Sequence, residues 1–148
     1  MPRFGNQSEA VATPRKRIIV LHEVADPAWR WISHHMPEFD WQFVHAPAAS
    51  GTLGNRLARL RAAVKVARTG RHADLVVSFG AGLGGALELV RRLRRVTTPH
   101  VCYYLNFDHL PEGFRRERQA KLYRTIDRFV VSATVERGIY ARHFGIDP

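Results

Sequence analysis

Short apolar runs alternate with longer amphipathic stretches along the chain from Arg17 onward. The apolar runs are rich in Val, Ile and aromatic residues and cover Arg17–Glu23, Trp41–Ala46, Asp74–Phe79, His100–Phe107 and Arg128–Ser132. Each run is followed by a stretch with helical periodicity, an alternation that is typical of right-handed crossovers around a parallel sheet. We therefore predict an α/β, Rossmann-like three-layer domain with a parallel sheet of about five strands, which binds ligands at the carboxyl ends of its strands.

Two of the predicted helices have distinctive sequences. The first follows Asp26, a good N-cap, and Pro27, which suits the first helical position. The helix after the second strand has the clearest apolar stripe of the chain, formed by Leu53, Leu57, Leu60 and Val64. We expect this stripe to pack on the sheet and the arginines between its members to face solvent. Those arginines are also compatible with an anionic membrane surface.

The chain is strongly basic, with 23 Lys and Arg residues against 13 Asp and Glu residues and a formal net charge of +10. This charge favours an anionic partner, which is a nucleic acid, a lipid surface or a phosphorylated small molecule. The arginines of the segment 91–95 lack interleaved aromatic residues, so we expect a solvated helix face and disfavour nucleic acid. Residues 1–16 are polar and predict a disordered tail, which leaves one domain over residues 17–148.

The single cysteine, Cys102, excludes a disulfide framework and a cysteine-based zinc site, and it favours a reducing cytoplasm. His34 and His35 are expected at the surface, and no spacing of histidines and carboxylates predicts a metal site. No segment approaches the roughly 18 apolar residues that span a bilayer. We therefore expect a cytoplasmic protein, either soluble or peripherally bound to a membrane.

The third strand and its helix are joined by a glycine-rich turn. Gly80, Gly82 and Gly85 satisfy the G-x-G-x-x-G spacing, which lets backbone amides approach a phosphate. Asp108, at the end of the following strand, is placed like the ribose-binding acid of a dinucleotide fold. However, the motif lies in the third unit of the chain, whereas the fingerprint normally belongs to the first. Since glycines also permit close packing of a helix on a sheet, ligand binding and a structural role both stay open.

Polar residues also follow the fourth and first predicted strands. Asp108 and His109 stand side by side close to Asn106, and such a pair can bind sugar hydroxyls or share a proton. A turn in which Asp108 bonds the local backbone is the alternative. His22 and Glu23 occupy the equivalent place after the first strand.

The last strand and helix carry a family resemblance. An aspartate precedes the strand, a serine ends it, a glutamate lies in the first turn of the helix, and Tyr, Phe-Gly-Ile and Pro follow: Asp127, Ser132, Glu136, Tyr140, Phe144–Ile146 and Pro148. This stretch is similar to the one that closes the N-terminal domain of GT-B glycosyltransferases of the retaining, glycosyltransferase-group-1 type. The order of the preceding units also resembles that domain over residues 17–148. The resemblance implies transfer of a sugar from a nucleotide-sugar co-substrate, with no other cofactor, to a glycan or lipid-linked acceptor bound largely by this domain.

The resemblance also assigns residues by position. Asp108 and His109 match the loop where the family often places a functional histidine, and we predict them to be catalytic. The predicted acceptor- and ligand-binding residues are His22, Glu23, Gly80, Gly82, Asn106, Ser132 and Glu136. For the last two a structural alternative exists, because Ser132 can bond the local backbone and Glu136 favours a helix N-terminus.

Two departures from the family affect this prediction. Residues 24–27 replace the paired glycines that often follow its first strand, which disfavours donor-phosphate contact there. The family continues beyond the position of Pro148 into a donor domain, so we expect this chain to be inactive without such a domain or a partner chain. The arginine-rich helices favour the inner face of a membrane. The rival predictions are a dinucleotide-binding enzyme that uses Gly80, Gly82 and Gly85, and a noncatalytic basic module that binds membranes or nucleic acid.

Overall fold

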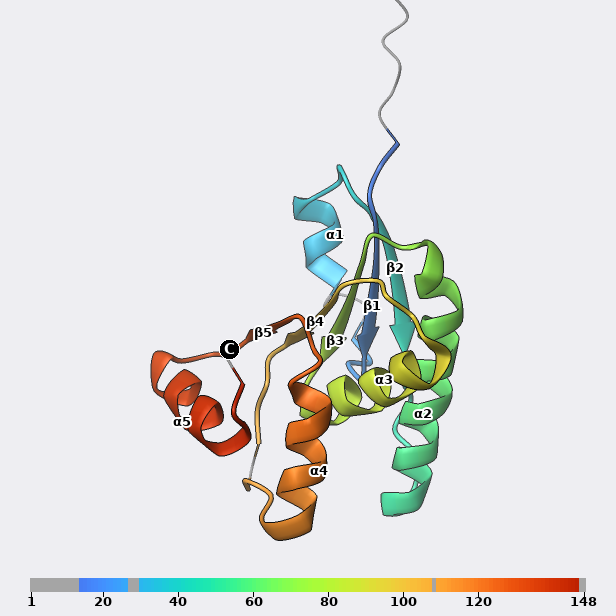
Figure 1. Ribbon diagram of the computed structural model, residues 1–148. Coiled ribbons are helices and arrows are strands. Elements are labelled where there is room, and N and C mark those ends of the chain that lie inside the picture. The colour runs from blue at the N-terminus through green and yellow to red at the C-terminus, as the bar shows by residue number, and fades with distance from the viewer. Residues whose placement is uncertain (1–13, 27–29, 108, 147–148) are drawn as a thin grey trace, which may run out of the picture.

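The computed structural model describes residues 14–26, 30–107 and 109–146 (Figure 1). The described strands are β1 (Arg17–His22), β2 (Asp40–His45), β3 (Leu75–Phe79), β4 (His100–Tyr103) and β5 (Arg128–Val130). The described helices are α1 (Trp31–His35), α2 (Gly51–Thr69), α3 (Ala81–Arg94), α4 (Gly113–Tyr123) and α5 (Thr134–Phe144), with a 3-10 turn η2 (Gly70–His72) after α2. Strand and helix therefore alternate as the sequence predicts.

The five described strands form one sheet in the order β2-β1-β3-β4-β5, and every neighbouring pair is parallel. This confirms the predicted α/β, Rossmann-like architecture. The chain first steps from β1 to β2 and afterwards advances in the opposite direction through β3, β4 and β5. The reversal between β1 and β3 is the switch point at which doubly wound sheets bind their ligands.

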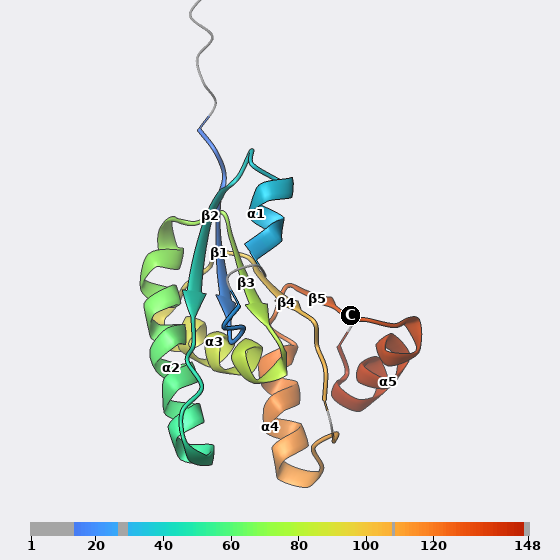
Figure 2. The same ribbon diagram turned by 180° about the vertical axis from the view of Figure 1, so that it is seen from behind.

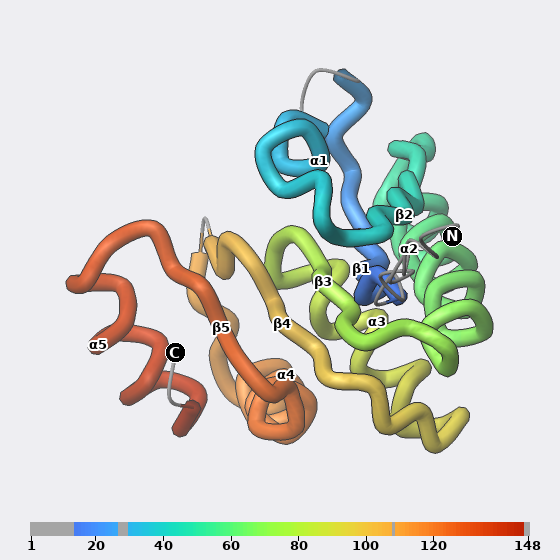
Figure 3. The backbone as a smooth tube through the Cα atoms, turned by 90° about the horizontal axis from the view of Figure 1, so that it is seen from above, coloured from blue at the N-terminus to red at the C-terminus, as the bar shows by residue number. Residues whose placement is uncertain are grey.

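The two faces of the sheet are covered unequally. Seen from above, α1 lies on one side of the sheet, and α3 and α4 lie on the other (Figure 3). The main core, under α2 and α3, is formed by aliphatic residues that include Ile19, Leu21, Val76, Leu83 and Leu87. A second, aromatic cluster joins α4 and α5, where the rings of Tyr123 and Phe144 meet edge to face at 5.1 Å. Because α5 packs into this cluster, it does not cover the opposite face of the sheet, where α1 lies.

Helix α2 differs from the prediction in which residues it buries. Leu53 and Leu57 are exposed, and the buried positions are Ala62, Ala63, Val66 and Ala67. The reason is length: 19 residues of helix span roughly 28 Å, whereas a strand of five or six residues spans about 17–20 Å. The first turns of α2 therefore extend past the carboxyl edge of the sheet (Figure 2).

The largest shifts from the predicted boundaries are at the end of β4 and at the start of α1. Strand β4 ends at Tyr103 and not at Phe107, because Tyr104 adopts a left-handed backbone with φ of 57° that a strand cannot continue. Helix α1 begins at Trp31 with Arg30 as its N-cap, so Asp26 is not the cap. Pro27 and Trp29 lie outside the described residues. His34 and His35 are exposed, as predicted.

Within the described residues no helix is both long and apolar enough to cross a membrane.

Candidate functional site

The carboxyl edge of the sheet at the β1–β3 switch point gathers several of the predicted site residues. His22 ends β1 and Glu23 follows it, and Gly80 and Gly82 follow β3, which pairs with β1. The turn after β3 is joined to the end of β4, because the Gly80 N–H donates to the Tyr103 carbonyl at 2.9 Å. The tips of three neighbouring strands therefore form one continuous edge.

His22 is a buried neutral imidazole at this edge. Its Nδ1 lies 3.0 Å from the Val24 carbonyl oxygen, and because a carbonyl only accepts, Nδ1 carries the proton and Nε2 the lone pair. Burial lowers the pKa of His22, and the neighbouring His45, whose ring centroid is 5.4 Å away, lowers it further. Near neutral pH the imidazole therefore stays uncharged and suits hydrogen bonding better than anion binding.

Glu23 is held by an arginine from the overhanging part of α2. Arg59 Nε lies 2.5 Å from one Glu23 carboxylate oxygen and Nη2 lies 3.2 Å from the other. Both side chains are about one-third exposed or more, so the pair is open to solvent. The bidentate contact fixes the guanidinium plane over the edge, a position that depends on α2 running past the strands. Sequence reasoning did not find Arg59, although its place two turns into α2 was visible.

The N-terminus of α3 completes this edge. Gly80 adopts φ of 83°, which favours glycine, and it provides no side-chain cap. A Cβ at Gly82 would lie 2.6 Å from Arg59 Nη1, so the guanidinium rests on the first turn of α3. The first amides of a helix lack intrahelical acceptors and carry partial positive charge. Together with Arg59 they form a positively polarised surface beside the Glu23 carboxylate.

The remaining glycines of this turn pack against protein. A Cβ at Gly84 would lie 2.7 Å from Cys102 Sγ, and one at Gly85 would lie 3.6 Å from the Tyr123 ring. Close approach of α3 to the sheet therefore requires a glycine at position 84. Gly85, the third glycine of the G-x-G-x-x-G spacing, faces the Tyr123 ring of α4 at ordinary van der Waals distance.

The predicted catalytic loop is described only in part. Asp108 lies outside the described residues, and Asn106 and His109 are exposed. The catalytic assignment of Asp108 and His109 stays a prediction.

Ser132 and Glu136 have a visible structural role after β5. One Glu136 carboxylate oxygen accepts hydrogen bonds from the backbone N–H groups of Ser132 and Ala133, at 3.1 and 3.2 Å. Glu136 thereby satisfies amides at the start of α5, as the alternative interpretation proposed. The contact leaves the Ser132 hydroxyl without an assigned role.

A second polar constellation is buried beneath α3. Ser78 Oγ lies 2.8 Å from His100 Nε2, and His100 Nδ1 lies 3.1 Å from Glu88 Oε2. The same Glu88 oxygen accepts from Arg91 Nη1 at 2.6 Å. The prediction that the 91–95 arginines form a solvated face is thus wrong for Arg91, which is buried by its pairing with Glu88. The signal that was missed is a Glu–Arg pair three residues apart inside an apolar helix.

This buried network has the order of a hydrolytic triad, but it is closed to solvent. The side chains of Ser78 and His100 have no exposed surface. Burial lowers the pKa of His100 despite the Glu88 hydrogen bond. Burial also raises the pKa of the Cys102 thiol to about 12, which makes this neighbouring sulfur unreactive. The network therefore fastens α3 to β3 and β4.

No group of three or more His, Cys, Asp or Glu side chains in the described part of the chain is placed to hold a metal ion. No protein-family model matches this chain, and comparison with curated proteins gave no match.

Proposed function

We propose that this chain is the acceptor-side domain of a GT-B glycosyltransferase, which acts with a donor-binding domain or partner chain. The reaction is transfer of a sugar from a nucleotide-sugar to a glycan or lipid-linked acceptor. The observation that carries the proposal is the constellation at the β1–β3 switch point, where the partly exposed Glu23–Arg59 pair meets the N-terminus of α3 beside the buried His22.

The chemistry of this edge suits a sugar bearing a phosphate. The partly exposed Glu23 carboxylate accepts hydrogen bonds from hydroxyl groups. The Arg59 guanidinium and the free amides of α3 attract an anionic oxygen. A sugar phosphate presents both kinds of group. The resemblance of residues 127–148 to the closing segment of a GT-B N-terminal domain supports the same assignment.

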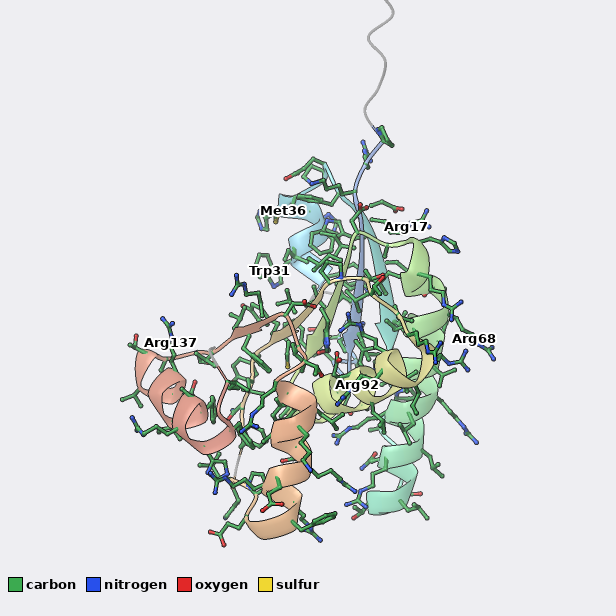
Figure 4. The ribbon with its side chains drawn as sticks, in the orientation of Figure 1. Arg17, Trp31, Met36, Arg68, Arg92 and Arg137 are labelled. Carbon is green, nitrogen blue, oxygen red and sulfur yellow. The ribbon has the colours of Figure 1, made fainter. Side chains whose placement is uncertain are left out.

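We further propose that the protein binds the surface of an anionic membrane from its cytoplasmic side through α2 and α3. The sequence of α2 has no acidic residue, and the one acidic residue of α3, Glu88, is buried. The exposed side chains include basic groups and two leucines: Arg61, Lys65, Arg68, Leu89, Arg92 and Leu93. Figure 4 labels Arg68 on α2 and Arg92 on α3. Such a mixture suits acidic headgroups and the adjoining apolar boundary.

Titration followed by amide NMR tests the site. Glycan phosphates should shift the signals of Glu23, Arg59 and Gly80–Gly82, and Glu23→Gln should weaken binding while Glu117→Gln on α4 should not. NAD, NADP and nucleotide-sugars are titrated in parallel. Tight binding of a nicotinamide dinucleotide to this chain would contradict the proposal and favour the dinucleotide-binding alternative.

Vesicle flotation tests the membrane proposal. Binding to vesicles rich in acidic phospholipid should decrease with salt, because it depends on charge. Replacing Arg61, Lys65 and Arg68 with Gln should reduce binding, whereas the matched triple replacement of Arg115, Arg118 and Arg142 should reduce it less. Equal loss in both variants would contradict a specific membrane face.

A further inference from the structure

An apolar groove lies on the α1 face of the sheet, opposite α2, α3 and α4. Its volume is about 520 Å³, and it is lined by side chains from α1, from the segment between α1 and β2, and from four strands of the sheet. The floor includes Val20, Leu75, Val77 and Val101, whose side chains alternate along their strands with core residues on the other face of the sheet. The groove therefore runs over the centre of the sheet.

The groove exists because one helical layer is incomplete. Parallel sheets are normally covered by helices on both faces. The helix that follows β5 does not provide this cover, because Tyr140 and Phe144 pack with Tyr123 on the α4 side, and no lining residue comes from α5. Figure 4 shows Trp31, the first residue of α1, and Met36, which directly follows α1, on the side away from β2, and both line the groove. Trp31 is 54% exposed, so this side of the groove is open to a ligand.

The lining selects for a hydrocarbon ligand. Among the lining side chains, Trp31, Trp41 and Tyr103 have a polar atom, and Trp41 Nε1 already donates to the Met36 carbonyl at 2.8 Å. The volume lies within the roughly 300–1,000 Å³ range of small-molecule pockets. A peptide strand would find no backbone partners on the face of a sheet, because its hydrogen bonds are directed within the sheet. An extended apolar chain meets the lining without unsatisfied groups.

One end of the groove reaches the positively polarised edge. Phe79 and Tyr103, whose ring centroids are 4.7 Å apart, line it immediately before Gly80 and Tyr104. Arg30 lies close by on the same face, with its guanidinium carbon 5.4 Å from the ring centroid of Phe43, the β2 partner of Val20. A chain seated in the groove would therefore place its head group among cationic groups.

We propose that the groove binds the hydrocarbon chain of a lipid phosphate, with the phosphate at the carboxyl edge beside Arg30. Charge complementarity supports this occupant, since the protein carries a net charge of +10 and guanidinium groups pair well with phosphate. Identifying this lipid phosphate with the sugar acceptor rests on the proposed function. Binding of the hydrocarbon chain in the groove does not depend on that function.

Fluorescence quenching in the full chain tests the proposal, because Trp31 and Trp41 line the groove. The probe is dodecyl phosphate brominated at the end of its chain and used below its micelle concentration. Saturable quenching is expected, and unlabelled dodecyl phosphate should reverse it. Inorganic phosphate should not compete, and dodecanoate should compete less well. Equal competition by dodecanoate would overturn the assignment of the phosphate.

Three variants test where the hydrocarbon chain and the phosphate head group of the lipid bind. Tyr103→Asp places a charge at the groove, and Val77→Phe narrows it without one; each should weaken binding by about tenfold or more, equivalent to 1.4 kcal/mol. Arg30→Gln should weaken binding about three- to tenfold, and Arg118→Gln on α4 is the control with the same loss of charge. Circular dichroism confirms that each variant is folded.

The readouts separate this inference from the proposed function. Absence of quenching, or quenching that folded Val77→Phe and Tyr103→Asp leave unchanged, overturns the groove as a lipid site and leaves the sugar-transfer proposal standing. A different result would assign the groove to a second copy of the protein. In that case the brominated probe gives no quenching, and the protein forms concentration-dependent dimers that Tyr103→Asp dissociates. Saturable quenching combined with tight NAD binding would retain the groove and refute the transferase.

Discussion

The buried network under α3 and the carboxyl edge both combine a histidine with a carboxylate, and both histidines are buried, but only the carboxylate at the edge is exposed to solvent. Under α3, Ser78, His100 and Glu88 are joined at distances that suit proton transfer, yet no substrate can reach the serine. At the edge, the Glu23–Arg59 pair is partly exposed beside the start of α3. Hydrogen-bond distances alone therefore do not define an active site, because the reacting groups must also be accessible to a ligand.

The largest expected effect comes from removing the buried carboxylate. Glu88→Gln leaves the Arg91 guanidinium buried without its close ion-pair partner, so we expect a loss of about 3–5 kcal/mol in the free energy of unfolding. Urea denaturation measures this loss. Glu117→Gln, on the exposed face of α4, should change stability by less than about 0.5 kcal/mol. If Glu88→Gln is as mild as its control, the buried network does not fasten α3.

Substitutions at two glycines of α3 allow the open edge and the buried network to be compared within a single helix. Gly84→Ala forces a methyl group against Cys102 Sγ and should cost about 1–3 kcal/mol. Gly82→Ala meets only the movable end of Arg59, so it should be close to neutral in stability and should displace the guanidinium from the edge. Thermal unfolding and the Arg59 side-chain NMR signals test the two parts. Equal destabilisation by both substitutions would contradict the difference in packing.

The buried network should also make the protein sensitive to acid. Burial lowers the pKa of His100 below its ordinary 6.5. Burial alone would raise the pKa of Glu88, but the His100 hydrogen bond and Arg91 outweigh it and hold this pKa below 4.5. In both cases the unfolded chain binds the proton more readily, so stability decreases as the pH falls below 6.5 and again below 4.5.

Urea midpoints measured from neutral to acidic pH test this prediction. The variant His100→Gln should show a shallower decline near pH 6.5 than the unmodified chain. Some dependence of stability on pH should persist in this variant, because burial also lowers the pKa of His22. An unchanged slope in the variant would refute the role of His100.

Breaking the ion pair at the open edge is expected to cost little stability. Glu23→Gln and Arg59→Gln break an exposed ion pair and should each cost no more than about 1 kcal/mol. The site can therefore be altered without unfolding the protein. A much larger loss in either urea titration would show that this edge is part of the structural core.

The fold could be predicted from the sequence because continuous apolar runs indicate buried strands and the helical spacing of apolar residues indicates amphipathic helices. The run Ile18–Leu21 indicated a central strand, and β1 indeed has neighbours on both sides. The exposed leucines of α2 could not be predicted, since their period is the same whether or not a strand lies beneath them. Their exposure depends on where the sheet ends, and that is a property of the assembled structure.

The candidate site could be predicted only at its strand ends. His22 and Glu23 were identified because they directly follow an apolar run, and their position at the switch point follows from topology. Arg59 reaches Glu23 across 36 residues of sequence, and no local pattern records that contact. The Ser78–His100–Glu88 network joins three elements in the same way, so its members were visible as residues but not as a set.

The position of β1 within the sheet sets an order of assembly. Its two neighbours are β2 and β3, so β1 lacks one of them until Phe79 has been synthesised. Because β4 and β5 lie beyond β3 in the sheet, we expect them to pair afterwards in the order in which they leave the ribosome. We expect nascent chains that end before β3 to expose the apolar faces of β1 and to need chaperones until β3 emerges.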